Sequence, residues 1–275
     1  MNLTSPSQVK AWCIENDFHP NKTMGQNFLI DRNALVSIVD AGLEPPAAEG
    51  PGNRILEVGP GLGVLTEEML ARGCTVTAIE KDPVLAARLP AALGNPPGLT
   101  VVAADALSVA ENPSRHGIEL ASFDRMISNL PYQAGTRILL EFVKQRAFSS
   151  MTVLVQAEVA ERLAAKEGSK TRGLAGVWTQ LDYDVKIVRK VAASCFWPRP
   201  EIGSSVVTLV RHDRNLSFSP EKRDFFYKLT KRAFEHRRKQ LGSIFKDLIK
   251  STARAEELSN NDWLTLVKGL TDENA

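Results

Sequence analysis

The chain has 275 residues, of which 43% are apolar and 24% charged, a composition typical of a folded globular protein. The cysteines Cys13, Cys74 and Cys195 form no CxxC pair, and the four histidines are scattered, so we expect neither a disulfide framework nor a metal site. Because no apolar run approaches membrane-span length and the N-terminus lacks a signal-peptide pattern, we expect a cytoplasmic protein without a membrane partner.

The small net charge of +2 hides an uneven distribution. Residues 219–254 hold eleven Lys/Arg against four Asp/Glu, whereas residues 255–275 hold one Lys against five Asp/Glu. A basic block inside an otherwise neutral chain is the pattern expected for a phosphate-bearing partner. The alternative is a solvated helix face.

Two short helices are predicted first, at residues 6–17 behind Ser5-Pro6 and at residues 32–41 behind the capping residue Asp31. From residue 54 onward, short apolar strands alternate with helical segments. The predicted strands are 54–58, 75–79, 100–103, 123–127 and 151–156, and the predicted helices are 62–71, 83–93 and 136–147. This alternation predicts an α/β fold with a Rossmann-like, doubly wound and mostly parallel sheet.

The pattern changes after residue 157. A helix at 159–165 and a polar loop at 167–173 precede two alternating runs, 185–191 and 205–210, which are expected to extend the sheet edge as an antiparallel pair. Helices are then predicted at 220–234, at 238–249 and around Trp263. We therefore expect a larger domain over residues 1–215 and a small all-helical domain over residues 216–275.

A glycine-rich turn follows the first strand of the predicted sheet, in the sequence ILEVGPGLGVLTEEML. Gly59, Gly61 and Gly63 allow positive φ and a close approach of the backbone to a ligand, and the helix N-terminus beyond them offers free N–H groups. A dinucleotide fingerprint needs a further glycine where Val64 stands. The pattern ExGxGxG, which starts at Glu57, instead resembles motif I of S-adenosylmethionine-dependent methyltransferases. The alternative is a plain tight turn.

A carboxylate follows each of the next two strands. Glu80 is placed to accept ribose hydroxyls, and Asp105 to accept a hydrogen bond from an adenine amino group. Lys81 and Ala106, which directly follow these two carboxylates in the sequence, are assigned to the same cofactor pocket. Glu80 could instead be a surface carboxylate and Asp105 a helix cap, but their succession at the carboxyl edge of one parallel sheet favours a shared site.

The fourth strand ends in SNLPYQ, at the same edge of the sheet. Methylating an exocyclic amine requires acceptors aimed at both of its N–H groups, so that its lone pair becomes available. Asn129 offers a side-chain oxygen, and a backbone carbonyl within the turn of Asn129, Leu130 and Pro131 offers another. Tyr132 offers a flat face for an extruded base. The alternative is an amide-capped turn with a buried tyrosine.

Several segments together resemble the ribosomal RNA adenine dimethyltransferases, in that family's order and over about residues 19–250. They are GQNFLID (25–31), EVGPGLGVLT (57–66), IEKD (79–82), SNLPY (128–132), FWPRPEIGSSVV (196–207) and FEHRRKQL (234–241). Among these enzymes, the chain is more similar to those of the bacterial small subunit than to the erythromycin-resistance methylases.

For the cofactor, S-adenosylmethionine, the resemblance implies a binding set. Asn27 and Leu29 would help to cover it, and Gly59 would meet its methionine portion. Glu80 would bind the ribose and Asp105 the adenine.

For the target, the resemblance implies that Asn129 holds both the cofactor side and the amine, and that Tyr132 and Phe196 sandwich the flipped adenine. The implied reaction is dimethylation of N6 on two adjacent adenosines, in a hairpin loop near the 3′ end of 16S rRNA within a 30S precursor. Departures from the family pattern stand at Ala192, Glu201 and Ser243, and they concern RNA affinity more than the reaction type.

The resemblance gives the basic block a role in RNA binding, in which phosphate contacts would fix position without reading sequence. We assign Arg232, Arg237, Arg238 and Lys239 to this role, and Lys22, Lys170 and Arg172 are weaker candidates of the same type. We expect a monomer. Two other functions stay open: a ribosome-assembly factor for which methylation is secondary, and a DNA adenine methyltransferase.

Overall fold

The computed structural model describes residues 1–21, 24–44, 53–215, 218–246 and 248–272. Two compact units are present: one comprises residues 1–160 and 186–211, and the other comprises residues 161–185 and 212–275. The division into functional domains at residue 215 stays a prediction.

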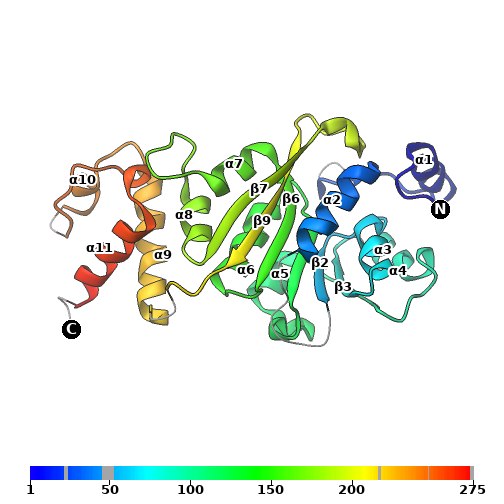
Figure 1. The fold of residues 1–275 in the computed structure, drawn as a ribbon, viewed down its shortest axis with the longest axis horizontal. Helices are drawn as coiled ribbons and strands as arrows, with labels where there is room; N and C mark the ends of the chain where they lie inside the picture. The colour runs from blue at the N-terminus through cyan, green and yellow to red at the C-terminus, as the bar shows by residue number, and fades with distance from the viewer. Residues whose placement is uncertain (22–23, 45–52, 216–217, 247, 273–275) are drawn as a thin grey trace. The chain divides into compact units, whose positions relative to one another are not determined.

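The central element is a seven-stranded sheet in the order β4-β3-β2-β5-β6-β9-β7 (Figure 1). Its strands are β2 (Arg54–Val58), β3 (Thr75–Glu80), β4 (Leu99–Ala103), β5 (Arg125–Asn129), β6 (Ser150–Gln156), β7 (Tyr183–Val191) and β9 (Ser204–Arg211). The pairs from β4 to β6 are parallel, and β9 runs antiparallel to β6. The predicted Rossmann-like architecture is confirmed.

The strand order reverses between β2 and β5, because the chain proceeds from β2 outward to β4 and then returns to β5. In open sheets of this kind, ligands bind beyond the carboxyl ends of the strands at such a reversal. The ends of β2 and β5 carry the glycine turn and the SNLPYQ segment, so the topology brings these two motifs together.

Helices connect the strands and flank them in sequence (Figure 1). They are α1 (Pro6–Glu15), α2 (Arg32–Leu43), α3 (Val64–Ala71), α4 (Pro83–Ala92), α5 (Ala106–Glu111), α6 (Gly135–Lys144), α7 (Ala157–Ala164), α8 (Leu174–Gln180), α9 (Pro220–Glu235), α10 (Leu241–Phe245) and α11 (Asn260–Asp272). Short 3-10 helices lie at Pro113–His116, Leu120–Ser122, Ala193–Cys195 and Ala255–Glu257. Apolar side chains from α2, α3 and the strands, among them Ile38, Leu65 and Ile127, form one continuous core.

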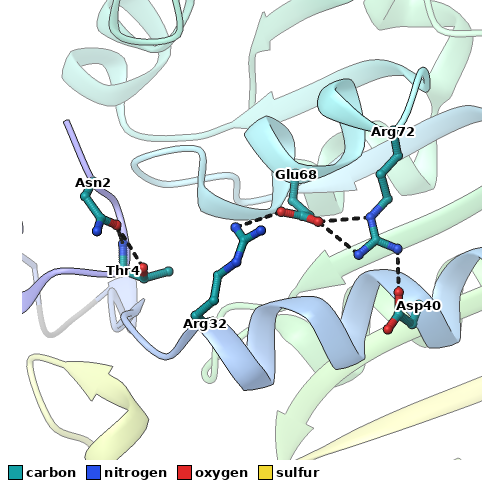
Figure 2. A network of polar contacts seen from close by, with 6 residues as sticks. All are labelled: Asn2, Thr4, Arg32, Asp40, Glu68 and Arg72. Carbon is teal, nitrogen blue, oxygen red and sulfur yellow. Dashed lines mark hydrogen bonds and ion pairs between the residues drawn. The ribbon is translucent and has the colours of Figure 1, made fainter.

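An ion-pair network joins α2 to α3 (Figure 2). Glu68 on α3 pairs with Arg32 of α2 at 2.8 Å and with Arg72 at 2.9 Å, and Arg72 also reaches Asp40 on α2. Because the Glu68 side chain is only 10% exposed, salt weakens its ion pairs less than those of a surface carboxylate. The network fixes the helix that follows residues 25–31.

Two details differ from the predictions. The helix predicted at 238–249 is wrong in extent, since among the described residues of this range only Leu241–Phe245 is helical. The backbone there folds back on itself instead: the Leu241 N–H donates to the Ala253 carbonyl, and the Gly242 N–H donates to the Ser251 carbonyl. A second small ladder was not predicted, in which β1 (Phe28–Leu29) pairs antiparallel with β8 (Phe196–Trp197).

Candidate functional site

The glycine turn joins β2 to α3 with three left-handed residues. Gly59, Gly61 and Gly63 have φ values of +66°, +59° and +90°. A side chain on Gly63 would be strained at this φ, and its Cβ atom, 2.5 Å from Cδ1 of Leu89, would also displace that buried leucine. The turn therefore brings main chain, rather than side chains, to the edge of the sheet.

Glu80 ends β3 and holds the turn from the side. Its Oε2 accepts a hydrogen bond from the Gly61 N–H at 3.1 Å, and its Oε1 accepts one from the Asp82 N–H at 2.9 Å. Burial raises the pKa of this carboxyl, although the backbone donors oppose the shift. Each oxygen keeps a second lone pair, so Glu80 can also accept hydrogen bonds from a ligand.

Glu57 is the acidic residue at the start of the ExGxGxG pattern, and it is only 1% exposed. Burial raises its pKa to about 8; the Thr66 hydroxyl, which donates to Oε2 at 2.6 Å, opposes this shift, and the nearby charge of Glu80 adds to it. Glu57 is therefore mainly protonated at neutral pH when the site holds no cation. The sequence pattern marks this residue but not its protonation state.

Asp105 follows β4 and serves as the cap of α5, with its Oδ1 accepting from the Leu107 N–H at 2.9 Å. Its Oδ2 pairs with Nζ of Lys81 at 2.7 Å, and this hydrogen bond lowers the pKa of Asp105. The helix-cap role and the position at the predicted pocket thus coexist in one residue, and Asp105 stays ionised at neutral pH.

Residues 25–29 cover the turn from the N-terminal side. Phe28 and Leu29 are buried and pair with β8, which carries Phe196. Gln26 was not predicted as a site residue, yet its amide nitrogen donates to Oδ2 of Asp82 at 2.9 Å. The position of Gln26 within the GQNFL motif is the sequence feature that could have identified it as a site residue. This contact ties the covering segment to the end of β3, next to Glu80.

Asn129 ends β5 inside this enclosure. Its amide nitrogen donates to the Asn27 carbonyl at 3.3 Å. This hydrogen bond fixes the orientation of the amide group and therefore the direction of Oδ1. Oδ1 is buried and has no hydrogen-bond partner among the described residues. A buried unpaired acceptor costs stability, so its presence points to a ligand donor at this place.

The turn after Asn129 is stiffened by main-chain contacts. The Leu130 N–H donates to the Leu154 carbonyl, and the Pro131 carbonyl accepts from the Gly135 N–H at 2.7 Å. Because the Pro131 oxygen already accepts a hydrogen bond from the first residue of α6, the Leu130 carbonyl is the better candidate for the second acceptor of the target amine.

Tyr132 and Phe196 lie next to each other, with ring centroids 6.4 Å apart and planes at 71°. This is an edge-to-face contact rather than a parallel slot, and Phe196 is only 2% exposed. The two predicted stacking residues are thus brought together, but a base that is to lie between them requires the rings to separate.

A cavity of about 310 Å³ unites most of the predicted residues, a size suited to a small-molecule ligand. Its lining includes Asn27, Leu29, Gly59, Gly61, Glu80, Lys81, Asp105, Ala106, Asn129, Leu130, Pro131 and Tyr132. Two predicted residues, Gly63 and Phe196, are not among the described lining residues. The cavity offers carboxylates for a cation and for ribose hydroxyls, a glycine turn for close approach and the open Asn129 oxygen. These features fit S-adenosylmethionine.

The basic residues at the end of α9 and directly after it fall into two groups. Arg238 and Lys239 are exposed. Arg237 is half-buried: its Nε contacts Oε2 of Glu256 at 3.1 Å, and its Nη2 donates to the Lys170 carbonyl. Arg232 is exposed but has its guanidinium 5.7 Å from the centroid of the Phe245 ring, a cation–π contact.

Three weaker candidates for RNA binding remain. Lys22 lies outside the described residues, and Lys170 is exposed. Arg172 is only 1% exposed, and its guanidinium donates to the Ala165 carbonyl at 3.0 Å and to Oδ1 of Asn260 at 2.9 Å. Its charge therefore serves the interior of its own unit and is not available to a phosphate at the surface.

Comparison with known proteins places the chain in a family. The sequence profile described as "Ribosomal RNA adenine dimethylase" matches residues 17–272. The chain belongs to the ribosomal RNA adenine dimethylase family. The resemblance drawn from the sequence motifs is thereby confirmed.

Members of the ribosomal RNA adenine dimethylase family from several bacteria align over most of the chain. The protein named "Ribosomal RNA small subunit methyltransferase A" in Deinococcus radiodurans is 40% identical over 243 residues, covering 87% of this chain and 76% of that protein. The protein of the same name in Lactobacillus helveticus is 35% identical and covers 94% of this chain and 89% of its own length. Both alignments span most of this chain and most of the relative.

Solved structures share the fold of this family member. A dimethyladenosine transferase from Plasmodium falciparum gives a TM-score of 0.72 at 20% identity, covering 89% of this chain and 97% of that chain. The 23S rRNA methyltransferase ErmE gives a TM-score of 0.61 at 21% identity, covering 89% of this chain and all of that chain. Both likenesses support the predicted class I methyltransferase fold.

Among the residues that the structure describes, no group of three His, Cys, Asp or Glu side chains is placed to hold a metal ion. Likewise, none of the helices in the described ranges is long and apolar enough to cross a membrane.

Proposed function

We propose that this chain transfers methyl groups from S-adenosylmethionine to N6 of two adjacent adenosines in 16S rRNA. The target is a hairpin loop near the 3′ end of that RNA within a 30S precursor, and the products are N6,N6-dimethyladenosines. Family membership and the name of the bacterial relatives support the substrate class. The observation that carries the chemistry is the buried, unpartnered Oδ1 of Asn129 in the cavity wall.

Binding of the cofactor is assigned to the edge of the sheet between β2 and β4. Gly59 and Gly61 let the methionine portion approach the main chain, and Glu80 accepts the ribose hydroxyls. Asp105 accepts from the adenine amino group, with Lys81 and Ala106 beside it. Asn27 and Leu29 close the pocket from the N-terminal side.

When bound, S-adenosylmethionine supplies an electrophilic methyl group on a positively charged sulfur. The residues of this chain act on the acceptor. Oδ1 of Asn129 and the Leu130 carbonyl accept hydrogen bonds from the two N–H groups of the adenine amine, which draws its lone pair out of the ring. The ring of Tyr132 supports the extruded base, with Phe196 at its edge. Catalysis then rests on positioning and on electrostatics, with no covalent bond to the protein.

RNA binding is assigned to the basic segment in the helical C-terminal region, residues 216–275. Arg238 and Lys239 are free to meet phosphates, and the guanidinium of Arg232 presents its charge over Phe245. The expected working form is a monomer in the cytoplasm.

The test is transfer of radiolabelled methyl groups to three substrates: 30S particles from cells lacking the resident enzyme, free 16S rRNA, and DNA. We expect labelling of the 30S particles and two adjacent dimethylated adenosines by mass spectrometry of the RNA. Loss of labelling in Asn129→Ala, with binding to 30S retained, would tie the activity to this site. Absence of N6-methylated adenosine in the RNA, or preferential labelling of DNA, would refute the proposal.

A further inference from the structure

Tyr132 makes a second specific contact besides the ring of Phe196. Its phenolic oxygen lies 2.6 Å from Oγ of Ser204, a short hydrogen bond in which either group can donate. Burial raises the pKa of the Tyr132 phenol, so that the hydroxyl keeps its proton at neutral pH and can serve in either direction. A function for this hydroxyl was not predicted from the sequence.

Ser204 is held firmly by the sheet. It is the first residue of β9, it is only 1% exposed, and its backbone pairs with Gln156 in the antiparallel ladder with β6. The neighbouring Gly203 carbonyl also accepts from the Ala157 N–H at 3.0 Å. The Ser204 hydroxyl is therefore held in place by the central sheet, whereas Tyr132 lies in the turn between β5 and α6.

The geometry of a tyrosine decides what such a contact controls. The hydroxyl lies on the axis through Cβ and Cγ, so a hydrogen bond there fixes the direction of this axis without blocking rotation of the ring about it. The edge contact with Phe196 restrains that remaining rotation. Phe196 and Ser204 come from the same chain segment, so that one segment restrains both degrees of freedom of the ring.

We infer that Ser204 is a positioning residue for the methyl acceptor, because it anchors the tyrosine ring on which the target adenine rests. This inference rests on the proposed function. A base supported by a ring that swings about its Cβ would be displaced relative to Oδ1 of Asn129, and a displacement of about 1 Å in a reacting group can lower a rate on the order of 100-fold.

The second methyl transfer is the more sensitive step. After the first transfer the amine carries a methyl group and retains one N–H for the two acceptors at Asn129 and Leu130. The acceptor then depends more strongly on the stacking surface for its orientation. Loss of the anchor should therefore reduce dimethylation more than monomethylation.

The experiment compares Ser204→Ala and Tyr132→Phe, each of which removes the hydrogen bond but keeps the strand or the ring. The double variant Ser204→Ala/Tyr132→Phe, the hydroxyl-restoring Ser204→Thr and the control Ser205→Ala complete the set. Ser205 is also buried and points to the opposite face of β9. The measurements are kcat and KM with 30S particles, the ratio of mono- to dimethyladenosine, the Kd of S-adenosylmethionine by calorimetry and the Tm.

We expect Ser204→Ala to lower kcat about tenfold and to raise the monomethyl fraction, with a cofactor Kd close to that of the wild type. Tyr132→Phe should give a similar loss, the double variant no further loss, and Ser204→Thr partial recovery. If Ser204→Ala matched Ser205→Ala in kcat and product ratio, or if the two single losses were additive, the inference would be overturned. A wild-type protein that forms no N6-methyladenosine would instead refute the proposed function itself.

Discussion

The cavity at the ends of β2 to β5 and the basic segment at residues 231–240 hold their functional groups in different ways. In the cavity, the geometry is set by the main chain: a left-handed glycine turn, strand ends, and a turn in which the Leu130 N–H donates and the Pro131 carbonyl accepts a hydrogen bond. In the basic segment, the roles depend on which partner each long side chain finds. Arg237 finds Glu256, whereas Arg238 remains exposed.

This difference shows why neighbouring charges in a sequence are not equivalent. A charge that is engaged inside its own unit contributes to folding, and only a charge left at the surface can release counterions when it meets a phosphate. In the cavity, by contrast, the group on which the proposed chemistry depends most, Oδ1 of Asn129, is buried and has no hydrogen-bond partner among the described residues. Variants in the cavity should therefore change turnover or cofactor binding, whereas variants in the basic segment should change stability or RNA affinity.

The largest effect is expected for Asn129→Ala. Removing Oδ1 removes an acceptor for the target amine, so kcat should fall on the order of 100-fold or more, while cofactor affinity is only partly reduced. Single-turnover methylation of 30S particles measures the loss. The matched control is Asn33→Ala, at an exposed position of α2. Equal turnover in wild type and Asn129→Ala would refute the role of this residue.

Glu80→Gln should act on cofactor binding. A glutamine has one oxygen, so it cannot accept from both the Gly61 and the Asp82 N–H groups and still bind a ribose as the carboxylate does. We expect the Kd of S-adenosylmethionine to rise roughly 10- to 100-fold, or about 1.4–2.7 kcal/mol. Calorimetry measures this, with Glu67→Gln at an exposed position of α3 as the control. An unchanged Kd would exclude Glu80 from the cofactor site.

Glu57 makes stability depend on pH. Its pKa is about 8 in the folded protein against an ordinary value of 4.5, so the folded state binds its proton more tightly than the unfolded state. This contribution is fully present below about pH 4.5 and is lost as the pH rises to about 8, by up to about 1.4 kcal/mol per pH unit. Urea unfolding of wild type and Glu57→Gln, without cofactor, should show a flatter pH profile for the variant. Parallel profiles would contradict the assignment.

The smallest effects should distinguish Arg237 from Arg238. Arg237→Gln loses a partly exposed ion pair with Glu256 and should lower the free energy of unfolding by about 0.5–1 kcal/mol. Arg238→Gln should leave stability unchanged, weaken binding to 30S particles severalfold and reduce the salt-dependence slope by about 1. Thermal unfolding and binding at several salt concentrations measure both. If both variants changed the free energy of unfolding and the affinity for 30S particles by the same amounts, the proposed difference between the two arginines would be refuted.

The sequence predicted the sheet and most of the cavity because these depend on local patterns. Apolar runs locate β2 to β6 within two residues, and the glycine spacing locates the turn. Failures occurred where distant segments decide the outcome. The helix α10 is short because the backbone at its start hydrogen-bonds to residues 251–254. The two-residue strand β1 is too short to show a periodic pattern in the sequence. The contact between Tyr132 and Ser204 belongs to the same class, since it is set by the position of β9.

The ladder between β1 and β8 also has a consequence for how the protein is made. During synthesis Phe28 and Leu29 leave the ribosome long before Phe196 and Trp197, so this pairing must wait until most of the unit formed by residues 1–160 and 186–211 has emerged. Contacts between segments so far apart in the chain carry a high loop-closure entropy and form late. The cover of the cavity and the partner ring of Tyr132 are therefore completed in a single late event. An incomplete chain that ends before residue 196 would have the glycine turn but not an enclosed site.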